Sequence, residues 1–187
     1  MFVVRPRIIV LAIGMRLAFP SVADAHRLDE YLQATRIDVS LDRVDVDIDL
    51  TAGVGVAPGV WALIDTDNNG RISDAEGRSY ADVVLKSLVL QVDGQAHPVA
   101  LVSARFPTFQ EITSGSGPIR IEARAPLPLL SAGRHTLRYR NTHRRATSVF
   151  LVNTLVPSTS AITIASQRRD PRQTELVLTY DVAARAP

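Results

Sequence analysis

Side chains that carry oxygen recur at alternate positions between Asp65 and Glu76, in the segment DTDNNGRISDAE. A calcium ion takes about six to eight hard oxygen ligands, and an EF-hand loop supplies them from alternate positions and from a final glutamate. The residues at those positions here are Asp65, Asp67, Asn69, Arg71, Ser73 and Glu76. The spacing therefore predicts a calcium site.

The remaining features of the segment fit the same chemistry. Arg71 would contribute its backbone carbonyl, Ser73 would act directly or through a water, and Glu76 would bind with both carboxylate oxygens. Gly70 stands where the loop turns sharply and needs a residue that tolerates positive φ. The alternative is an acidic surface turn that caps a helix, since Asp74 and Glu76 also suit a helix N-terminus.

Two helices are expected to flank this loop. Pro58 suits a first helical position and begins a short helix that reaches Ile64. A longer helix follows from Ser73 to about Lys86. The sequence thus predicts a helix-loop-helix EF-hand insertion at about residues 56–86. It contains no second loop of this kind, which argues against a sensor that works through paired hands.

The rest of the chain predicts strands. In the segment 44–50, Val and Ile alternate with Asp45, Asp47 and Asp49, which indicates a strand with one buried and one wet face. We interpret the aspartates as a solvated face, because a flat row lacks the convergence of a metal site. Other strands are expected near residues 33–39, 119–125, 135–140, 147–156, 161–167 and 174–182. About nine short strands predict a mainly β fold, an antiparallel β-sandwich of immunoglobulin-like type that forms a single domain over residues 26–187.

The Asp93-Gly94 dipeptide predicts a tight hairpin turn. The segments on either side, 87–92 and 98–106, are both rich in apolar and β-branched residues, and we expect them to pair. The following segment, 107–111, is expected to be an irregular connector or an edge of the sheet.

Residues 1–25 resemble an export signal. Arg5 and Arg7 precede an apolar run, and Ala23-Asp24-Ala25 offers a small-x-small cleavage site. The run is shorter than the roughly 20 apolar residues of a membrane span, although an uncleaved anchor is the alternative. The sequence therefore predicts a periplasmic or secreted protein that begins at His26, with no transmembrane segment in the mature chain. The chain has no cysteine, so disulfides cannot stabilise it.

Removal of this leader changes the charge balance. The 187-residue chain has 21 basic and 19 acidic residues, and the leader holds three Arg and one Asp, so the mature chain is neutral. A nucleic-acid partner gains no support from this balance. The acidic residues concentrate before residue 100 and the basic residues after it. The two halves could attract each other, or they could simply form solvated faces of opposite sign.

Several short phrases are similar to a known family. They are HRLDEYL at the predicted mature start, FPTFQ at 106–110, TLRYRN at 136–141 and SQRRDP at 166–171. Together they resemble the extracytoplasmic domain of bacterial HupE/UreJ-type membrane proteins, which are linked to nickel or cobalt handling. The resemblance implies a periplasmic module that is an accessory to a membrane metal permease or another envelope protein.

Other functions have weaker signals. An N-terminal His26 would offer an imidazole and an α-amino group to Ni(II), Co(II) or Cu(II), which makes a transition-metal carrier the main alternative. It would need further ligands, and His97, His135 and His143 are the other histidines. No nucleophile elbow, HExxH motif or phosphate loop is present, so we expect no enzyme. A third possibility is an adhesion or assembly module.

Overall fold

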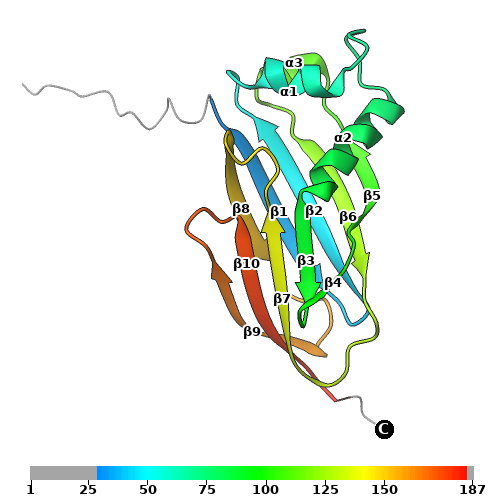
Figure 1. Ribbon diagram of the computed structural model, residues 1–187, viewed down its shortest axis with the longest axis vertical. Coiled ribbons are helices and arrows are strands. Elements are labelled where there is room, and N and C mark those ends of the chain that lie inside the picture. Colours follow the sequence, from blue (N-terminus) through cyan, green and yellow to red (C-terminus); the bar gives the residue numbers. More distant parts are fainter. Residues whose placement is uncertain (1–28, 185–187) are drawn as a thin grey trace, which may run out of the picture.

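The computed structural model describes residues 29–184 of the chain. The predicted leader, its cleavage site and His26 lie outside the described residues. Within them the chain is mainly β, as the sequence predicts. Ten strands form two five-stranded sheets, and three helices gather toward one end of the molecule (Figure 1).

The first sheet has the strand order β5-β6-β2-β1-β8. Its edge strand β8 runs parallel to β1, whereas the other neighbours in the sheet are antiparallel. The sheet is therefore not purely antiparallel, because most of the chain lies between β1 and β8 and a long connection permits parallel pairing. The strands are β1 (Tyr31–Val39), β2 (Arg43–Ala52), β5 (Ala100–Arg105), β6 (Ile119–Pro126) and β8 (Ser148–Thr154).

The second sheet has the order β4-β3-β7-β10-β9, and all of its neighbours are antiparallel. Its last strands, β9 and β10, lie close to the segments that the sequence predicts. The strands are β3 (Leu88–Val92), β4 (Gln95–Ala96), β7 (Gly133–Asn141), β9 (Ile162–Arg169) and β10 (Glu175–Val182).

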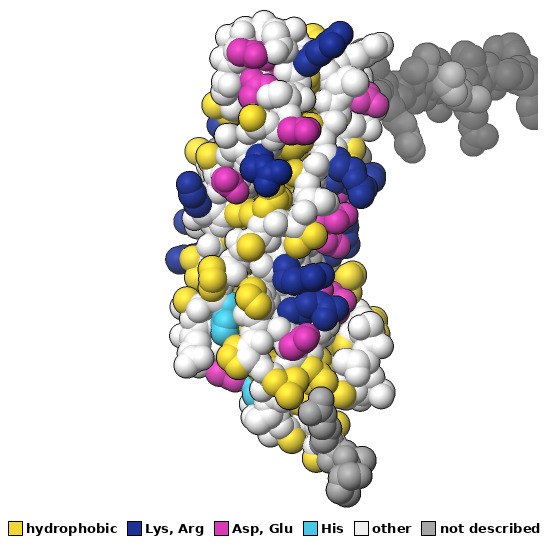
Figure 2. Space-filling model, turned by 90° about the vertical axis from the view of Figure 1, so that its right-hand side faces the viewer, with side chains coloured by type: hydrophobic (Ala, Val, Ile, Leu, Met, Phe, Trp, Pro, Cys, Tyr) yellow, Lys and Arg dark blue, Asp and Glu magenta, His cyan; other side chains and the backbone are white. Residues whose placement is uncertain are grey.

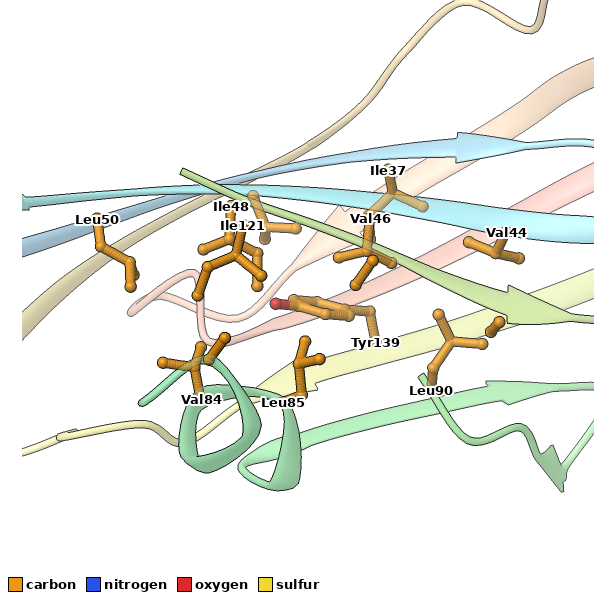
Figure 3. Close-up of a cluster of buried hydrophobic side chains, with 14 of the residues drawn as sticks. Ile37, Val44, Val46, Ile48, Leu50, Val84, Leu85, Leu90, Ile121 and Tyr139 are labelled. Carbon is orange, nitrogen blue, oxygen red and sulfur yellow. The ribbon is translucent and has the colours of Figure 1, made fainter. Parts of the chain in front are cut away.

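One hydrophobic core joins the two sheets to the helices. Every second residue of β2 is buried, as its alternating sequence predicts, because successive side chains of a strand point to opposite faces. Figure 3 shows Tyr139 of β7 with Val46 of β2 on one side and Leu85 of helix α2 on the other. The Tyr139 hydroxyl lies 3.1 Å from that of Thr35, so this buried polar group has a partner.

The predicted hairpin around Asp93 and Gly94 is partly wrong. The turn exists, but β3 pairs there only with the two-residue β4 and then with β7. The chain next crosses to the first sheet, where β5 pairs with β6. Pro98 lies at the crossing. It has no backbone N–H to donate, so it cannot extend the ladder beyond the bond from His97 to Leu90.

The segment predicted to be an irregular connector contains a short helix, α3 (Phe109–Thr113). A capping box begins it: the Thr108 hydroxyl accepts from the Glu111 N–H, and the Glu111 carboxylate accepts from the Thr108 N–H. A threonine followed three residues later by a glutamate is a recognised signal for a helix start. The start of this helix could therefore have been predicted from the sequence.

Acidic residues of the first half of the chain meet basic residues of the second half across β2 and β6. Arg124 donates to Asp45 at 2.6 Å, and Arg120 lies 3.9 Å from Asp49. Figure 2 shows basic and acidic side chains interleaved on one face of the molecule. The row of aspartates on β2 is thus matched largely by arginines, and such part-exposed pairs contribute little each.

The two helices that flank the acidic loop, α1 (Ala57–Ile64) and α2 (Asp74–Lys86), each contain a glycine with a different environment. A Cβ at Gly59 of α1 would meet nothing within 4 Å, whereas a Cβ at Gly77 of α2 would lie 2.7 Å from the Phe106 ring. Gly59→Ala is expected to raise the free energy of unfolding by about 0.5–1 kcal/mol, because alanine loses less entropy in a helix.

Gly77→Ala is expected to have the opposite sign and to cost about 1–3 kcal/mol, because the ring of Phe106 must move. Urea unfolding of both variants measures the two effects. In a Phe106→Leu background the cost of Gly77→Ala should shrink. Stabilisation by both glycine replacements would contradict this account of the α2 packing.

Candidate metal site

The acidic segment forms the connection between α1 and α2. Ala57 begins α1 with Pro58 in its first turn, and Asp65 is its C-cap. Ser73 is the N-cap of α2: its hydroxyl accepts from the Glu76 N–H, while the Glu76 carboxylate accepts from the Ser73 N–H. The helix boundaries agree with those expected from the sequence. Both ends of the loop are therefore fixed by helix ends that the sequence specifies locally.

Three carboxylates converge in this loop. Asp65, Asp67 and Glu76 each offer an oxygen atom, and these atoms lie within 4.8 Å of one another. Asp65 is 4% exposed and Glu76 is 9% exposed, while Asp67 faces solvent. No other group of three Asp, Glu, His or Cys side chains comes this close within residues 29–184. The arrangement could hold a metal ion, and its all-oxygen donor set suits a hard cation.

Asp65 is held in place from two sides. Its Oδ2 accepts from the Trp61 indole at 2.9 Å and from the Gly70 N–H at 3.0 Å, and its Oδ1 accepts from the Asn69 N–H at 3.1 Å. Gly70 has a φ of 81°, the positive value that the sequence predicts for the turn. The loop backbone therefore curls around this carboxylate, so that Asp65 keeps one orientation.

Glu76 ties the two ends of the loop together. Its Oε1 accepts from the backbone and the hydroxyl of Thr66 at 2.7 and 3.0 Å, and its Oε2 accepts from the backbone and the hydroxyl of Ser73 at 2.9 and 2.8 Å. These hydrogen bonds, those from Ser73 first, lower the pKa of Glu76 to about 2. Glu76 is thus fully ionised at neutral pH, as a metal ligand must be.

Of the other predicted ligands, Asn69 and Ser73 donate to carboxylates of the cluster, whereas Arg71 contacts Asn69 through its backbone. The Asn69 side-chain amide donates to Asp67 at 2.7 Å, and its oxygen accepts from the Arg71 N–H at 2.8 Å. The Arg71 side chain is exposed, as expected for a residue that would serve through its backbone. Ser73 donates its hydroxyl to Glu76. The side-chain oxygens of Asn69 and Ser73 each accept a backbone hydrogen bond of the loop, from Arg71 and from Glu76.

Two residues that hold the site were not predicted from the sequence. Trp61 precedes Asp65 by four residues, so one turn of helix brings the indole next to the carboxylate. This spacing was visible in the sequence. Thr66 contacts Glu76 across the loop, and no sequence signal indicates that contact.

The transition-metal alternative gains no support from the histidines of the described region. The Nδ1 of His135 lies 2.7 Å from Asp93 Oδ2, and its Nε2 lies 2.9 Å from the Ser131 carbonyl oxygen. Both partners accept, so both ring nitrogens must carry protons and neither can bind a metal. His143 is 5% exposed, and its Nε2 lies 3.2 Å from the Tyr80 hydroxyl. No histidine between residues 29 and 184 joins a candidate metal cluster.

Comparisons with protein-family models, with curated proteins and with solved structures found no match. None of the helices within residues 29–184 combines the length and the hydropathy of a membrane span.

Proposed function

We propose that this chain is an exported, non-enzymatic calcium-binding module in which the loop from Asp65 to Glu76 holds one calcium ion. In this proposal the two sheets form an immunoglobulin-like β-sandwich, and α1, the loop and α2 form a single EF-hand inserted between β2 and β3. The observation that carries the proposal is the convergence of Asp65, Asp67 and Glu76 in a loop whose sequence matches the calcium pattern.

Calcium would act by completing the local fold. Three negative side chains whose oxygens lie within 4.8 Å repel one another, and a divalent cation removes that repulsion. It would also fix the junction of the short helix α1, because Asp65 is both its C-cap and a ligand. The affinity expected is modest, with a Kd of about 10⁻⁴–10⁻³ M as in extracellular modules, because no second hand stiffens the loop.

The test is the unfolding midpoint of the chain in chelator and in excess calcium. A ligand that binds only the native state adds RT ln(1 + [L]/Kd), so a calcium concentration about 100 times Kd adds about 2.7 kcal/mol. Glu76→Gln should remove the response. Trp61 is the sole tryptophan of the chain and donates to Asp65, so its fluorescence provides a second readout of the same site.

Glu111→Gln is the matched control for Glu76→Gln. Glu111 forms the same capping box with Thr108 at the start of α3, but it belongs to no acidic cluster. This variant should therefore retain the full calcium response. The proposal fails if calcium at millimolar concentration changes neither the midpoint nor the fluorescence, or if the two variants lose the response equally.

A further inference from the structure

A pocket of about 700 Å³ opens beside the acidic loop, between the two helices and the connection from β7 to β8. Leu63 of α1 and Val83 of α2 line it, and they are 46% and 52% exposed. Ile64 of α1 also lines it and is buried. The volume lies within the range of about 300–1,000 Å³ that is common for small-molecule sites. The apolar walls suit the hydrocarbon part of a ligand.

A chain of buried polar groups reaches this pocket. The Tyr31 hydroxyl lies 2.9 Å from the Tyr80 hydroxyl, which lies 3.2 Å from Nε2 of His143. Tyr80 and His143 line the pocket and are each 5% exposed, and Tyr31 is fully buried. No hydrogen bond links Nδ1 of His143 to another residue of the described range 29–184. Nδ1 of this pocket-lining residue therefore has no protein partner within the described range, and it is not among the fully buried unpaired atoms of that range, so a ligand can reach it.

The direction of these hydrogen bonds determines whether Nδ1 of His143 is a donor or an acceptor. If His143 donated to Tyr80 and Tyr80 to Tyr31, the proton of the fully buried Tyr31 would have no acceptor among the described residues. In the opposite direction Tyr31 donates to Tyr80 and Tyr80 donates to Nε2, so every hydroxyl proton is used. Nε2 is then the acceptor of a neutral imidazole, and Nδ1 carries the proton. A residue of the pocket lining thus carries an N–H donor without a protein partner in the described range.

A positive charge lies beside this donor. Arg144 follows His143, lines the pocket and is exposed. Burial lowers the pKa of His143, and the charge of Arg144 lowers it further. Glu76 also lines the pocket, but both of its carboxylate oxygens accept hydrogen bonds within the acidic loop. The polar part of the pocket therefore offers donors and a cation to a ligand.

We propose that this pocket binds an amphiphilic carboxylate, a molecule the size of a medium-chain fatty acid, with its carboxylate between Arg144 and Nδ1 of His143. The apolar part packs against Leu63 and Val83. Arginine matches a carboxylate through paired N–H donors, and a second donor from His143 fixes the orientation. The site adjoins the calcium loop, because Glu76 lines the pocket, but none of the four residues that would contact this ligand is a proposed calcium ligand.

The test is a calorimetric titration of the protein with decanoate and with decanol, in chelator so that calcium cannot precipitate the fatty acid. Decanoate should bind at least about tenfold more tightly than the neutral alcohol of equal length, since about 1.4 kcal/mol from one charge-assisted contact is a factor of ten. Arg144→Asn should abolish most of that preference. Asparagine tolerates the left-handed backbone found here, where Arg144 has a φ of 46°.

Two controls separate the pocket from nonspecific effects. Arg145→Asn removes a neighbouring exposed charge outside the pocket lining and should leave binding unchanged. Ser79→Trp places an indole in the pocket and should block both ligands, whereas Asp82→Trp on an exposed position of the same helix should not. Equal affinity for decanoate and decanol, no binding, or equal losses in the two arginine variants would overturn the proposal. Because the titration contains no calcium, its result is independent of the calcium test.

Discussion

Replacing Trp61 by alanine is expected to lower the free energy of unfolding by about 3–5 kcal/mol, as for other buried aromatic residues. Trp61 is 7% exposed and belongs to the hydrophobic core. Its ring makes an edge contact with Phe109 of α3 at a centroid distance of 5.2 Å, and its indole N–H donates to Asp65. One side chain thus joins α1 to α3 and orients the first carboxylate of the loop. Its removal leaves a cavity and takes away one of the two donors to Asp65 Oδ2, so that only the Gly70 N–H remains.

Trp61→Phe separates the two contributions. The smaller ring can still pack near Phe109, but it cannot donate to Asp65, so a loss of about 1.5 kcal/mol is expected from the hydrogen bond to a charged group. Both variants lack the sole tryptophan, so urea unfolding is followed by circular dichroism. A loss below about 1 kcal/mol in the alanine variant would contradict the packing argument. Equal losses in the two variants would contradict the division between packing and hydrogen bond.

The local geometry of the acidic loop could be predicted because its causes lie within about a dozen residues. Gly70 has the positive φ that the pattern requires, and Ser73 starts α2 as an N-cap. Asp65, Asp67 and Glu76 converge because alternate positions of a curled backbone face the same point. Sequence patterns specify such features well, since every partner is a near neighbour along the chain.

The features that escaped prediction depend on distant segments. No pattern in the sequence indicates that β8 pairs with β1. These two strands form the one parallel pair among the described strands. Strands β3 and β5 lie in different sheets because β3 pairs with β7, whereas β5 pairs with β6. The contact between Tyr80 and His143 joins a helix to a strand connection 63 residues away. Periodicity shows which face of an element is apolar, but not what will cover it.

The position of His143 leads to the second large effect, on acid stability. Burial, followed by the nearby charge of Arg144, lowers the pKa of His143 to about 4 from the ordinary value of 6.5. In the unfolded chain the imidazole of His143 becomes protonated as pH falls below 6.5, whereas in the folded chain it stays neutral until about pH 4. The stabilisation is therefore complete above pH 6.5 and is lost as pH falls through this window. Over the whole window the free energy of unfolding is expected to fall by about 3 kcal/mol.

Other titrating groups act in different windows. The pKa of His135 is raised, because its hydrogen bonds to Asp93 and to the Ser131 carbonyl outweigh the opposing effect of burial. Its contribution is complete below pH 6.5 and is lost as pH rises above that value. Carboxylates with lowered pKa, such as Glu76 and Glu111, lose their contributions only below about pH 4.5. Between pH 6.5 and 4.5 the change in the free energy of unfolding is therefore expected to come mainly from His143.

Urea unfolding at several pH values between 4.5 and 7 measures this effect, with His143→Gln as the control. Glutamine can accept from the Tyr80 hydroxyl but does not titrate, and the backbone bonds of residue 143 to Gln33 and Asn141 are kept. The variant should be less stable than the parent at pH 7 yet show a much flatter slope on acidification. If the two slopes agree across this interval, His143 does not titrate as a buried neutral base. The hydrogen-bond direction inferred for Tyr31 and Tyr80 would then be wrong as well, because that direction requires a neutral imidazole that accepts at Nε2.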